Sequence, residues 1–567
     1  MEISCSVTDF RWDGPVLYIT LCAAPIPFDE LPQRYHKKAD EERYDQQEEP
    51  KELQFGLRKK GQLIPLQTFA GPKSGTYTVR LNVTNISSRK EVPNGAWKIV
   101  PCWNHRTSIP VDFDPARDQE LSECSRTFLF DENRQAYVVN FDLSEDDQRP
   151  ELVMRVFHYQ NKVKWRTIPG GFKRRLRVWL MRGGALAGFL QLWYAIWHNL
   201  SRPPGNRVLF AAQQRKDVAG NLRCVRDRMV ERGLDQQYDL REWTDPNKAK
   251  FARLLRSWLR LSKAMASSDY VFVDDYCRLL DYITLSRDTV LTQLWHAGYG
   301  FKAVGFARFG RYGSPRLDCG HRQYTYAICG STHLRTIYSE VFGIEEDAIL
   351  PTGLPRIDGF LDQNHAEQVR SDFSRDYPEL QGKRILLFAP TYRGRGSYTA
   401  HYDYRQLDLE KLYELCGDQA VVLFRMHPFI KKKPPIPKGF SDRLIDFSRY
   451  PETNDLLYLS DVLITDYSSI VYEYSLLDRP MLFFAYDEAA YQAARGFHGD
   501  YREIVPGKVC NTFSELLTAL RDGDFEHERV ARYRARYFDH TDTGSTDRVI
   551  DQIVLRGKSP VIPSTDS

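Results

Sequence analysis

Short runs of β-branched and aromatic residues, bounded by Gly, Pro, Asn or Asp, recur through residues 1–165. Runs of this kind predict β-strands, here over residues 16–21, 76–83, 97–101 and 137–143. The charged stretch 34–51 between them predicts an exposed loop. We therefore expect residues 1–165 to form a β-rich accessory domain, folded as a sandwich.

From residue 206 the pattern changes to short, continuous apolar runs that alternate with helical patterns. Such runs predict parallel strands covered on both faces by helices. The first set is expected at residues 207–212, 270–274, 291–295, 326–330 and 348–353, and the second at 385–389, 420–426, 462–466 and 481–485. The fold class is thus α/β, with two Rossmann-like domains over residues 206–365 and 366–556 and a disordered tail at 557–567. Ligands of such sheets bind outside the carboxyl ends of the strands.

Residues 166–205 join these parts and combine cations with an apolar, Trp-rich helical run. No Asp or Glu occurs between residues 152 and 216, which is typical of a segment that lies in the plane of an anionic membrane surface. The expected membrane-associating residues are Lys173, Arg174, Arg175, Arg177, Trp179, Trp193 and Trp197. The alternative is a buried connector helix with a solvated basic cap. The apolar run 183–197 is too short to span a bilayer.

Composition narrows the classes of function. The 567 residues carry a formal net charge of only +4, so nucleic acid is not an expected partner. The ten cysteines contain no C-x-x-C pair, which argues against a disulfide framework or a zinc site and favours a reducing location. Residues 1–6 lack the basic and apolar regions of a secretory signal, so none is expected.

Polar residues that could bind a ligand or take part in catalysis follow the predicted strands. Ser468 and Ser469 come after the strand that ends in Thr465 and Asp466, and they precede a helix expected to run from Ile470 to Leu477. Backbone N–H groups and the helix dipole at such a turn favour a phosphate. An ordinary capped helix is the alternative interpretation.

Two histidines occupy similar positions. His296 follows a strand and precedes a Gly-rich turn, where an imidazole could accept a proton from an attacking hydroxyl. His427 and Arg425 end a strand of the second set, where they could stabilise phosphate charge. The further anion-binding candidates are Thr391, Arg393 and Arg495. Each residue alone could equally be structural or solvated.

Absent motifs exclude other classes. The chain contains no G-x-x-x-x-G-K-[ST] loop and no G-x-G-x-x-G after the first strand of the α/β region, so ATPase and dehydrogenase functions are disfavoured. Neither H-E-x-x-H nor G-x-S-x-G occurs. We see no carboxylate cluster that demands a metal ion.

Taken together, the motifs resemble one known family. They are LWHAG and FKAVG within 294–305, GLPRID at 353–358, FAPTYR at 388–393, RMHP at 425–428, SDVLITDYSS at 460–469, RPMLFF at 479–484 and RGF with DY within 495–501. In this order they resemble the CDP-glycerol glycerophosphotransferases, the teichoic acid polymerases and primases of bacterial walls. The resemblance covers residues 207–551 and implies a GT-B fold.

The resemblance implies transfer of glycerol phosphate from CDP-glycerol to a hydroxyl of a lipid-linked polyol-phosphate or glycan acceptor, with release of CMP. His296 would be the general base, and His427, Ser468, Ser469 and Arg495 would hold the donor pyrophosphate. The enzyme would act peripherally at the cytoplasmic face of the membrane. It would need no cofactor, although a divalent cation could accompany the pyrophosphate.

One departure concerns the acceptor side, because AGYGFK follows His296 where many relatives have GTPLK. Three alternatives stay open: a CDP-ribitol-dependent ribitol-phosphate transferase, a GT-B glycosyltransferase that uses a nucleotide sugar, and a non-catalytic scaffold for wall assembly.

Overall fold

The computed structural model describes residues 2–26, 53–103, 106–107, 110–131, 133–144, 150–160, 171, 175, 184–213, 217–245, 251–296, 298–299, 301–311, 313–394 and 398–555. The stretch 34–51 and the tail 557–567 lie outside these ranges. The chain divides into two compact units. The first comprises Met1–Trp179, Val304–Arg322 and Glu340–Glu345, and the second comprises Leu180–Ala303, Gln323–Ser339 and Glu346–Ser567. The first unit thus takes in two segments from the middle of the chain.

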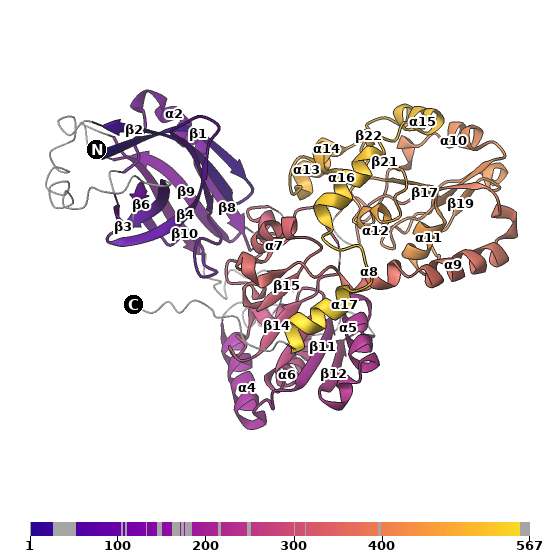
Figure 1. Cartoon of the computed structure of the whole chain (residues 1–567), viewed down its shortest axis with the longest axis horizontal. Helices are drawn as coiled ribbons and strands as arrows, with labels where there is room; N and C mark the ends of the chain where they lie inside the picture. The colour runs from indigo at the N-terminus through magenta and orange to yellow at the C-terminus, as the bar shows by residue number, and fades with distance from the viewer. Residues whose placement is uncertain are drawn as a thin grey trace. The chain divides into compact units, whose positions relative to one another are not determined.

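The first unit is built on one antiparallel sheet in the order β1-β2-β5-β4-β3-β6-β10-β9-β8, with β7 paired to β6 (Figure 1). The strands are β1 (Glu2–Asp13), β2 (Val16–Ile26), β3 (Gln54–Lys59), β4 (Gln62–Ala70), β5 (Thr76–Asn82), β6 (Gly95–Trp103), β7 (Arg106–Thr107), β8 (Arg126–Phe130), β9 (Gln135–Leu143) and β10 (Leu152–Gln160). A short helix, α2 (Asp118–Cys124), precedes β8. The expected β-rich character is confirmed.

The expected sandwich is replaced by a single bent sheet. The first half of β4 pairs with β3 through Gln62 to Leu66, and its second half pairs with β5 through Gln67 to Ala70. A strand that changes partner in this way turns the corner between two half-sheets, so both halves share one core. Trp97, which is fully buried, belongs to that core.

The second unit contains two six-stranded parallel sheets (Figure 1). The first has the order β12-β11-β13-β14-β15-β16. Its strands are β11 (Arg207–Gln213), β12 (Asp239–Asp245), β13 (Tyr270–Val273), β14 (Val290–Gln293), β15 (Tyr326–Ile328) and β16 (Ile349–Leu350). Its helices are α4 (Ala185–Ser201), α5 (Gly220–Glu231), α6 (Phe251–Ala266), α7 (Arg335–Phe342) and α8 (Pro355–Phe360).

The second sheet has the order β19-β18-β17-β20-β21-β22. Its strands are β17 (Arg384–Phe388), β18 (Ala420–Phe424), β19 (Leu444–Asp446), β20 (Val462–Thr465), β21 (Met481–Phe484) and β22 (Lys508–Cys510). The remaining helices are α9 (Gln363–Asp376), α10 (Leu409–Cys416), α11 (Thr453–Leu459), α12 (Val471–Ser475), α13 (Glu488–Arg495), α14 (Tyr501–Ile504), α15 (Phe513–Asp522), α16 (Glu528–Tyr537) and α17 (Ser545–Val549), which continues into a π-helical turn, Ile550–Leu555.

Both sheets are doubly wound, because the strand order reverses once in each. In the second sheet β17 neighbours both β18 and β20, and ligands of such sheets bind in a crevice at the point of reversal, so we refer to the carboxyl ends of β17 and β20 as the crevice. The four residues of β20 are all buried, as a strand covered on both faces requires. This crevice is where the topology favours a ligand.

The last described helix packs on helices of the first sheet. Helix α17 packs on α5 and α8 (Figure 1). Asp547 accepts hydrogen bonds from Arg228 and Arg232, and the Asp358 carboxylate accepts from the backbone N–H groups of Ser545 and Thr546. These contacts tie the C-terminal helix to the first sheet within the same unit.

Candidate functional site

His296 lies just beyond β14, with 43% of its side chain exposed. Its Nδ1 is 3.3 Å from the backbone oxygen of Asp274 and 3.7 Å from a carboxylate oxygen of Asp275. A carbonyl oxygen only accepts, so in the neutral ring Nδ1 carries the proton and donates it. The lone pair is then on Nε2, which makes His296 a proton acceptor at that atom.

Asn221 of α5 holds the backbone that carries His296. Its fully buried amide donates to the carbonyl oxygens of Leu294 at 2.9 Å and Trp295 at 2.6 Å. Trp295 has a φ of +50°, a conformation that costs a non-glycine residue free energy, so the turn needs such fixed partners.

The segment after His296 runs along the second sheet's helices. A Cβ atom at Gly298 would collide with the ring of Tyr472 in α12, so the turn lies directly on that helix. Lys302 then pairs with Phe497 in a short antiparallel bridge. The turn that carries His296 therefore contacts the helix that follows Ser468 and Ser469, and the same segment pairs further on with the residues that follow Arg495.

The crevice between β17 and β20 is braced by a buried ion cluster. Asp466 is fully buried and accepts from the backbone N–H of Thr391 at 2.7 Å and from Arg393 at 2.8 Å. Arg393 also bonds both carboxylate oxygens of Asp487, at 2.6 and 2.8 Å. Burial alone would lower the pKa of Arg393, but Asp466 and Asp487 outweigh it and raise that pKa.

Two threonines complete the crevice. The Thr465 hydroxyl donates to the carbonyl oxygen of Ala389 at 2.8 Å, which links the ends of the two strands. The buried Thr391 hydroxyl has no hydrogen-bond partner among the described residues, so it is free to contact a ligand. The structure thus uses Thr465, Asp466 and Arg393 as braces and leaves Thr391 unsatisfied.

Ser468 and Ser469 are half-buried at the turn after β20. The helix expected from Ile470 to Leu477 is shorter, since α12 spans only Val471–Ser475 and begins after Ile470 without a side-chain cap. The Ser468 hydroxyl accepts from the backbone N–H of Ile470 at a long 3.5 Å. Both hydroxyls therefore remain able to donate.

His427 follows β18 and has the opposite tautomer from His296. The backbone N–H of Phe429 donates to its Nδ1 at 3.1 Å, so the neutral ring carries its proton on Nε2. Burial, Lys302 and Arg425 lower the pKa of His427 to about 4, which keeps the ring neutral near pH 7. His427 is therefore an uncharged N–H donor at Nε2.

The two remaining arginines, Arg425 and Arg495, differ in how many of their N–H donors form hydrogen bonds. Arg425 bonds the hydroxyl of Thr453 through Nε and Nη2 and the carbonyl oxygen of Ser448 through Nη1. Arg495, at the end of α13, donates to the carbonyl oxygen of Gly394 at 2.8 Å, which is its one hydrogen bond within the described ranges. Arg425 thus anchors a loop, whereas most of the Arg495 donors have no acceptor among the residues that the structure describes.

Sequence reasoning missed several residues of this region. Asn221, Arg356 of α8 and Glu473 of α12 form a chain, because Arg356 donates its backbone N–H to Asn221 and its guanidinium to Glu473. Lys302 and Asp275 were also missed. Among these residues, only Lys302 could have been suspected from the sequence, because it lies within the FKAVG motif. The other residues are important through contacts between distant segments of the chain.

The basic segment is described only in part. Lys173, Arg174, Arg177 and Trp179 lie outside the described residues, and Arg175 lies within them. Trp193 donates its Nε1–H to the carbonyl oxygen of Leu259, and Lys263 lies 3.5 Å from the centre of the Trp197 ring. Both tryptophans thus pack on α6 instead of forming the outer face of α4.

The outer face of α4 is nevertheless apolar. Its exposed side chains include Phe189, Leu192, Ile196 and Leu200. None of the helices in the described ranges combines the length and apolar character that crossing a bilayer requires. Across those same ranges, no group of three or more His, Cys, Asp or Glu side chains gathers as metal ligands would.

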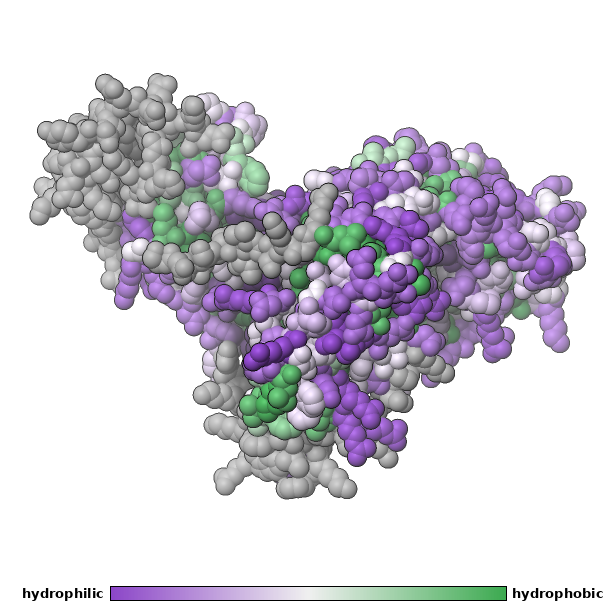
Figure 2. Space-filling model, turned by 60° about the horizontal axis from the view of Figure 1, so that its bottom comes forward, coloured by the Kyte–Doolittle hydropathy of each residue, from purple (hydrophilic) through white to green (hydrophobic). Residues whose placement is uncertain are grey.

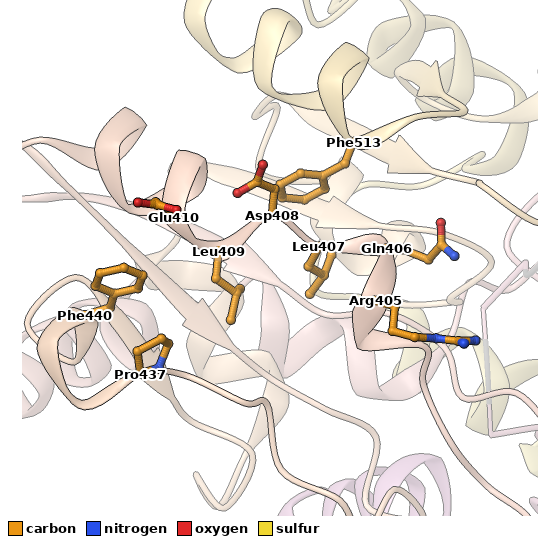
Figure 3. A pocket seen from close by; sticks show the side chains of 9 residues that line it. All are labelled: Arg405, Gln406, Leu407, Asp408, Leu409, Glu410, Pro437, Phe440 and Phe513. Atoms are coloured by element: carbon orange, nitrogen blue, oxygen red, sulfur yellow. The ribbon is translucent and has the colours of Figure 1, made fainter.

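A hollow of about 640 Å³ lies elsewhere on the second sheet's helices (Figure 3). It is lined by Arg405, Gln406, Leu407, Asp408, Leu409, Glu410, Pro437, Phe440 and Phe513. None of the candidate site residues contributes to it, and it does not lie at the strand ends that carry them. We therefore keep the candidate site at the crevice.

Known proteins are similar to this chain in sequence and in fold. The teichoic acid ribitol-phosphate polymerase TarL of Staphylococcus aureus is 37% identical over 61% of this chain and 62% of its own length. The teichoic acid glycerol-phosphate primase of Bacillus spizizenii is 33% identical over 48% of this chain and 70% of its length. This chain therefore spans about three fifths of the length of TarL.

A solved structure of the wall teichoic acid polymerase TagF has a TM-score of 0.51 and 20% identity, and the match covers 67% of this chain and 96% of that chain. That likeness concerns the fold. A sequence model described as CDP-glycerol:poly(glycerophosphate) glycerophosphotransferase matches residues 194–555, which is more than half of this chain. The chain therefore belongs to the CDP-glycerol:poly(glycerophosphate) glycerophosphotransferase family.

Proposed function

We propose that this protein transfers a polyol phosphate from a CDP-alditol to a hydroxyl of a lipid-linked acceptor and releases CMP. The observation that carries the proposal is the pair of opposite tautomers. His296 presents a lone pair at Nε2, as a base must, and His427 presents an N–H, as a group that stabilises phosphate charge must. The segment that begins at His296 continues to Lys302, whose charge helps to lower the pKa of His427.

In the proposed step, His296 Nε2 takes the proton from the acceptor hydroxyl. The acceptor oxygen forms a bond to the phosphorus that bears the alditol, and the bond from that phosphorus to the bridging oxygen of CMP breaks. The electron pair and the negative charge leave with CMP. In the same step, His427, Ser468, Ser469 and Arg495 donate to the phosphate oxygens, where fixed donors lower the barrier most.

The choice of alditol rests on the relatives. The family is named for CDP-glycerol, whereas TarL and TarK of Staphylococcus aureus, both 37% identical to this chain, are named as ribitol-phosphate polymerases. Glycerol-phosphate primases are 33% and 28% identical. We propose ribitol as the alditol to test beside glycerol.

The test is release of CMP from CDP-ribitol and CDP-glycerol in the presence of a lipid-linked polyol-phosphate acceptor. His296→Ala should lower kcat by roughly 10²–10⁴-fold, the usual worth of positioned acid–base catalysis, with little change in donor KM. His365→Ala, an exposed histidine of α9, is the matched control. Release of a nucleoside diphosphate would indicate a glycosyltransferase instead, and a kcat within a few-fold of wild type would exclude His296 as the base.

We also propose that α4 and α6 dock on an anionic membrane surface, where the acceptor lipid resides. The two helices pack together and contain no Asp or Glu. The apolar outer face of α4 is accompanied by exposed cations on α6, namely Arg253, Arg256, Arg260 and Lys263. Figure 2 shows hydrophobic side chains gathered at the lower end of this face, in the region of α4. Apolar burial combined with cations near anionic lipid is the usual basis of such docking.

Sedimentation with vesicles tests this surface. The protein should bind vesicles that contain phosphatidylglycerol more tightly than pure phosphatidylcholine vesicles, and Leu192→Ser with Ile196→Ser should weaken binding. Val230→Ser, at an exposed apolar residue of α5, is the control. Equal binding by the double variant and wild type would exclude α4 as the docking face.

A further inference from the structure

We propose that the ε-ammonium group of Lys302 binds phosphate oxygens of the nucleotide donor and so completes the anion site from the segment that carries the base. This rests on the proposed function for the identity of the donor.

The backbone fixes Lys302 at the site. Ala303 donates its N–H to the carbonyl oxygen of Gly496 at 3.0 Å, and His498 donates to the carbonyl oxygen of Phe301 at the same distance. These bonds flank the bridge between Lys302 and Phe497. Since Phe497 is two residues from Arg495, the two cations approach the crevice from paired backbone segments.

The charges around Lys302 are arranged for an anion. Arg393 pairs with both Asp466 and Asp487, so these three groups together keep one negative charge, which the two cations Lys302 and Arg495 outweigh. Over the described part of the chain, no carboxylate forms an ion pair with Lys302 or Arg495. Unpaired cations that converge beside an N–H donor of His427 leave a site of net positive charge, which a diphosphate would neutralise.

Titration of Lys302 supports the same conclusion. Burial lowers its pKa to about 8, Asp466 raises it, and Arg495 and Arg393 lower it. The other group that titrates nearby, His427, has a pKa of about 4 and stays neutral in this range. A bound phosphate favours the ammonium form, so donor binding near pH 8 takes up a proton, and affinity falls as the pH rises above 8.

The position of Lys302 also links donor binding to the orientation of the proposed base, His296. His296 and Lys302 lie on one short segment, which is held in its middle by Gly298 on Tyr472 and at its end by Phe497. A donor phosphate bound by Lys302 therefore contacts the stretch of backbone that orients the base. Loss of this contact should affect kcat as well as donor KM.

Calorimetric titration with CDP tests the proposal, with cytidine as the probe that lacks phosphate. With a pKa of about 8 for Lys302, wild-type affinity for CDP should fall about fivefold between pH 8 and 9, and buffers of different ionisation enthalpy should reveal proton uptake. Lys302→Met should weaken CDP binding at pH 7 at least tenfold and leave cytidine binding unchanged. Lys302→Arg should retain affinity at pH 7 and lose the proton uptake. Lys411→Met, at an exposed lysine of α10, is the control.

The outcomes separate this proposal from the proposed function. If CMP is released from a CDP-alditol but Lys302→Met binds CDP as wild type does, the Lys302 proposal is overturned and the function stands. If CDP binding depends on Lys302 but no CMP is released, the site stands and the transfer reaction falls. Proton uptake that persists in Lys302→Arg also overturns the proposal, and that readout does not depend on the folding of the Met variant.

Discussion

Removing Arg356 should destabilise the protein strongly, because Arg356 neutralises a buried carboxylate. The Glu473 side chain is 4% exposed and that of Arg356 is 25% exposed. Breaking a buried pair from one side typically costs about 3–5 kcal/mol, since the remaining charge loses both water and its partner. Arg356 Nε is buried without a hydrogen-bond partner among the described residues, and its removal relieves that cost. We therefore expect Arg356→Met to lose about 3 kcal/mol at pH 8.

The destabilisation caused by removing Arg356 should depend on pH, because the remaining Glu473 titrates. Burial raises the pKa of Glu473 and Arg356 lowers it. Without Arg356 the folded-state pKa rises further above the unfolded value, so the penalty grows as pH rises above about 4.5 and fades below it. Arg356→Met should thus be closer to wild type at pH 5.5 than at pH 8.

Urea unfolding at both pH values, read as midpoint and slope, measures these differences. Arg356→Met combined with Glu473→Gln should be milder than Arg356→Met alone, because no unpaired charge remains. Arg375→Met, at a surface arginine that is 68% exposed, should stay within about 0.5 kcal/mol of wild type. A loss below 1 kcal/mol for Arg356→Met, or a double variant no milder than the single one, would refute the reasoning.

Three further predictions follow from the site. Arg495→Ala should raise the donor KM about 10- to 100-fold, as loss of a charge-assisted hydrogen bond does, and an unchanged KM in the CMP assay would remove Arg495 from the phosphate site. Gly298→Ala should cost about 1–3 kcal/mol and lower kcat, because its methyl group meets the Tyr472 ring, whereas Gly359→Ala has open space and should be mild. Burial lowers the pKa of His498 to about 4, so the free energy of unfolding of the protein should fall as the pH falls from 6.5 towards 4. His498→Gln should flatten that dependence by about 1.4 kcal/mol per pH unit in urea titrations, and an unchanged slope would contradict it.

Strands buried on both faces were predictable, and three of the four edge strands of the two parallel sheets were not. The residues of β13 and β20 are apolar and fully covered, so their sequences carry a continuous signal. The edge strand β12 is polar and largely open to solvent, and β19 and β22 have three residues each. A strand with one exposed side or few residues has no distinctive hydrophobic pattern, which is why these three escaped prediction.

The sequence predicts candidate residues for the site but not the contacts that hold them. Motifs at strand ends make His296, His427 and Asp466 candidates, because ligands of parallel sheets bind at the carboxyl ends of the strands. The bond from Asn221 to the turn of Trp295, and the bridge of Lys302 to Phe497, join residues far apart in sequence. Such pairings leave no local pattern.

The four cationic candidates for phosphate binding, Arg393, Arg425, Arg495 and Lys302, differ in how many N–H donors remain for a ligand. A guanidinium has five N–H donors, and a ligand can use only those that the protein leaves free. Arg393 spends its donors on Asp466, Asp487 and the carbonyl oxygen of Thr391, and it lies between aromatic rings, so its role is to hold β17 against β20. Arg425 is likewise spent on a loop. Over the described residues, Arg495 makes a single hydrogen bond and Lys302 has no ion pair, so these two have donors left for the phosphates of the proposed donor, whereas Arg393 and Arg425 have structural partners.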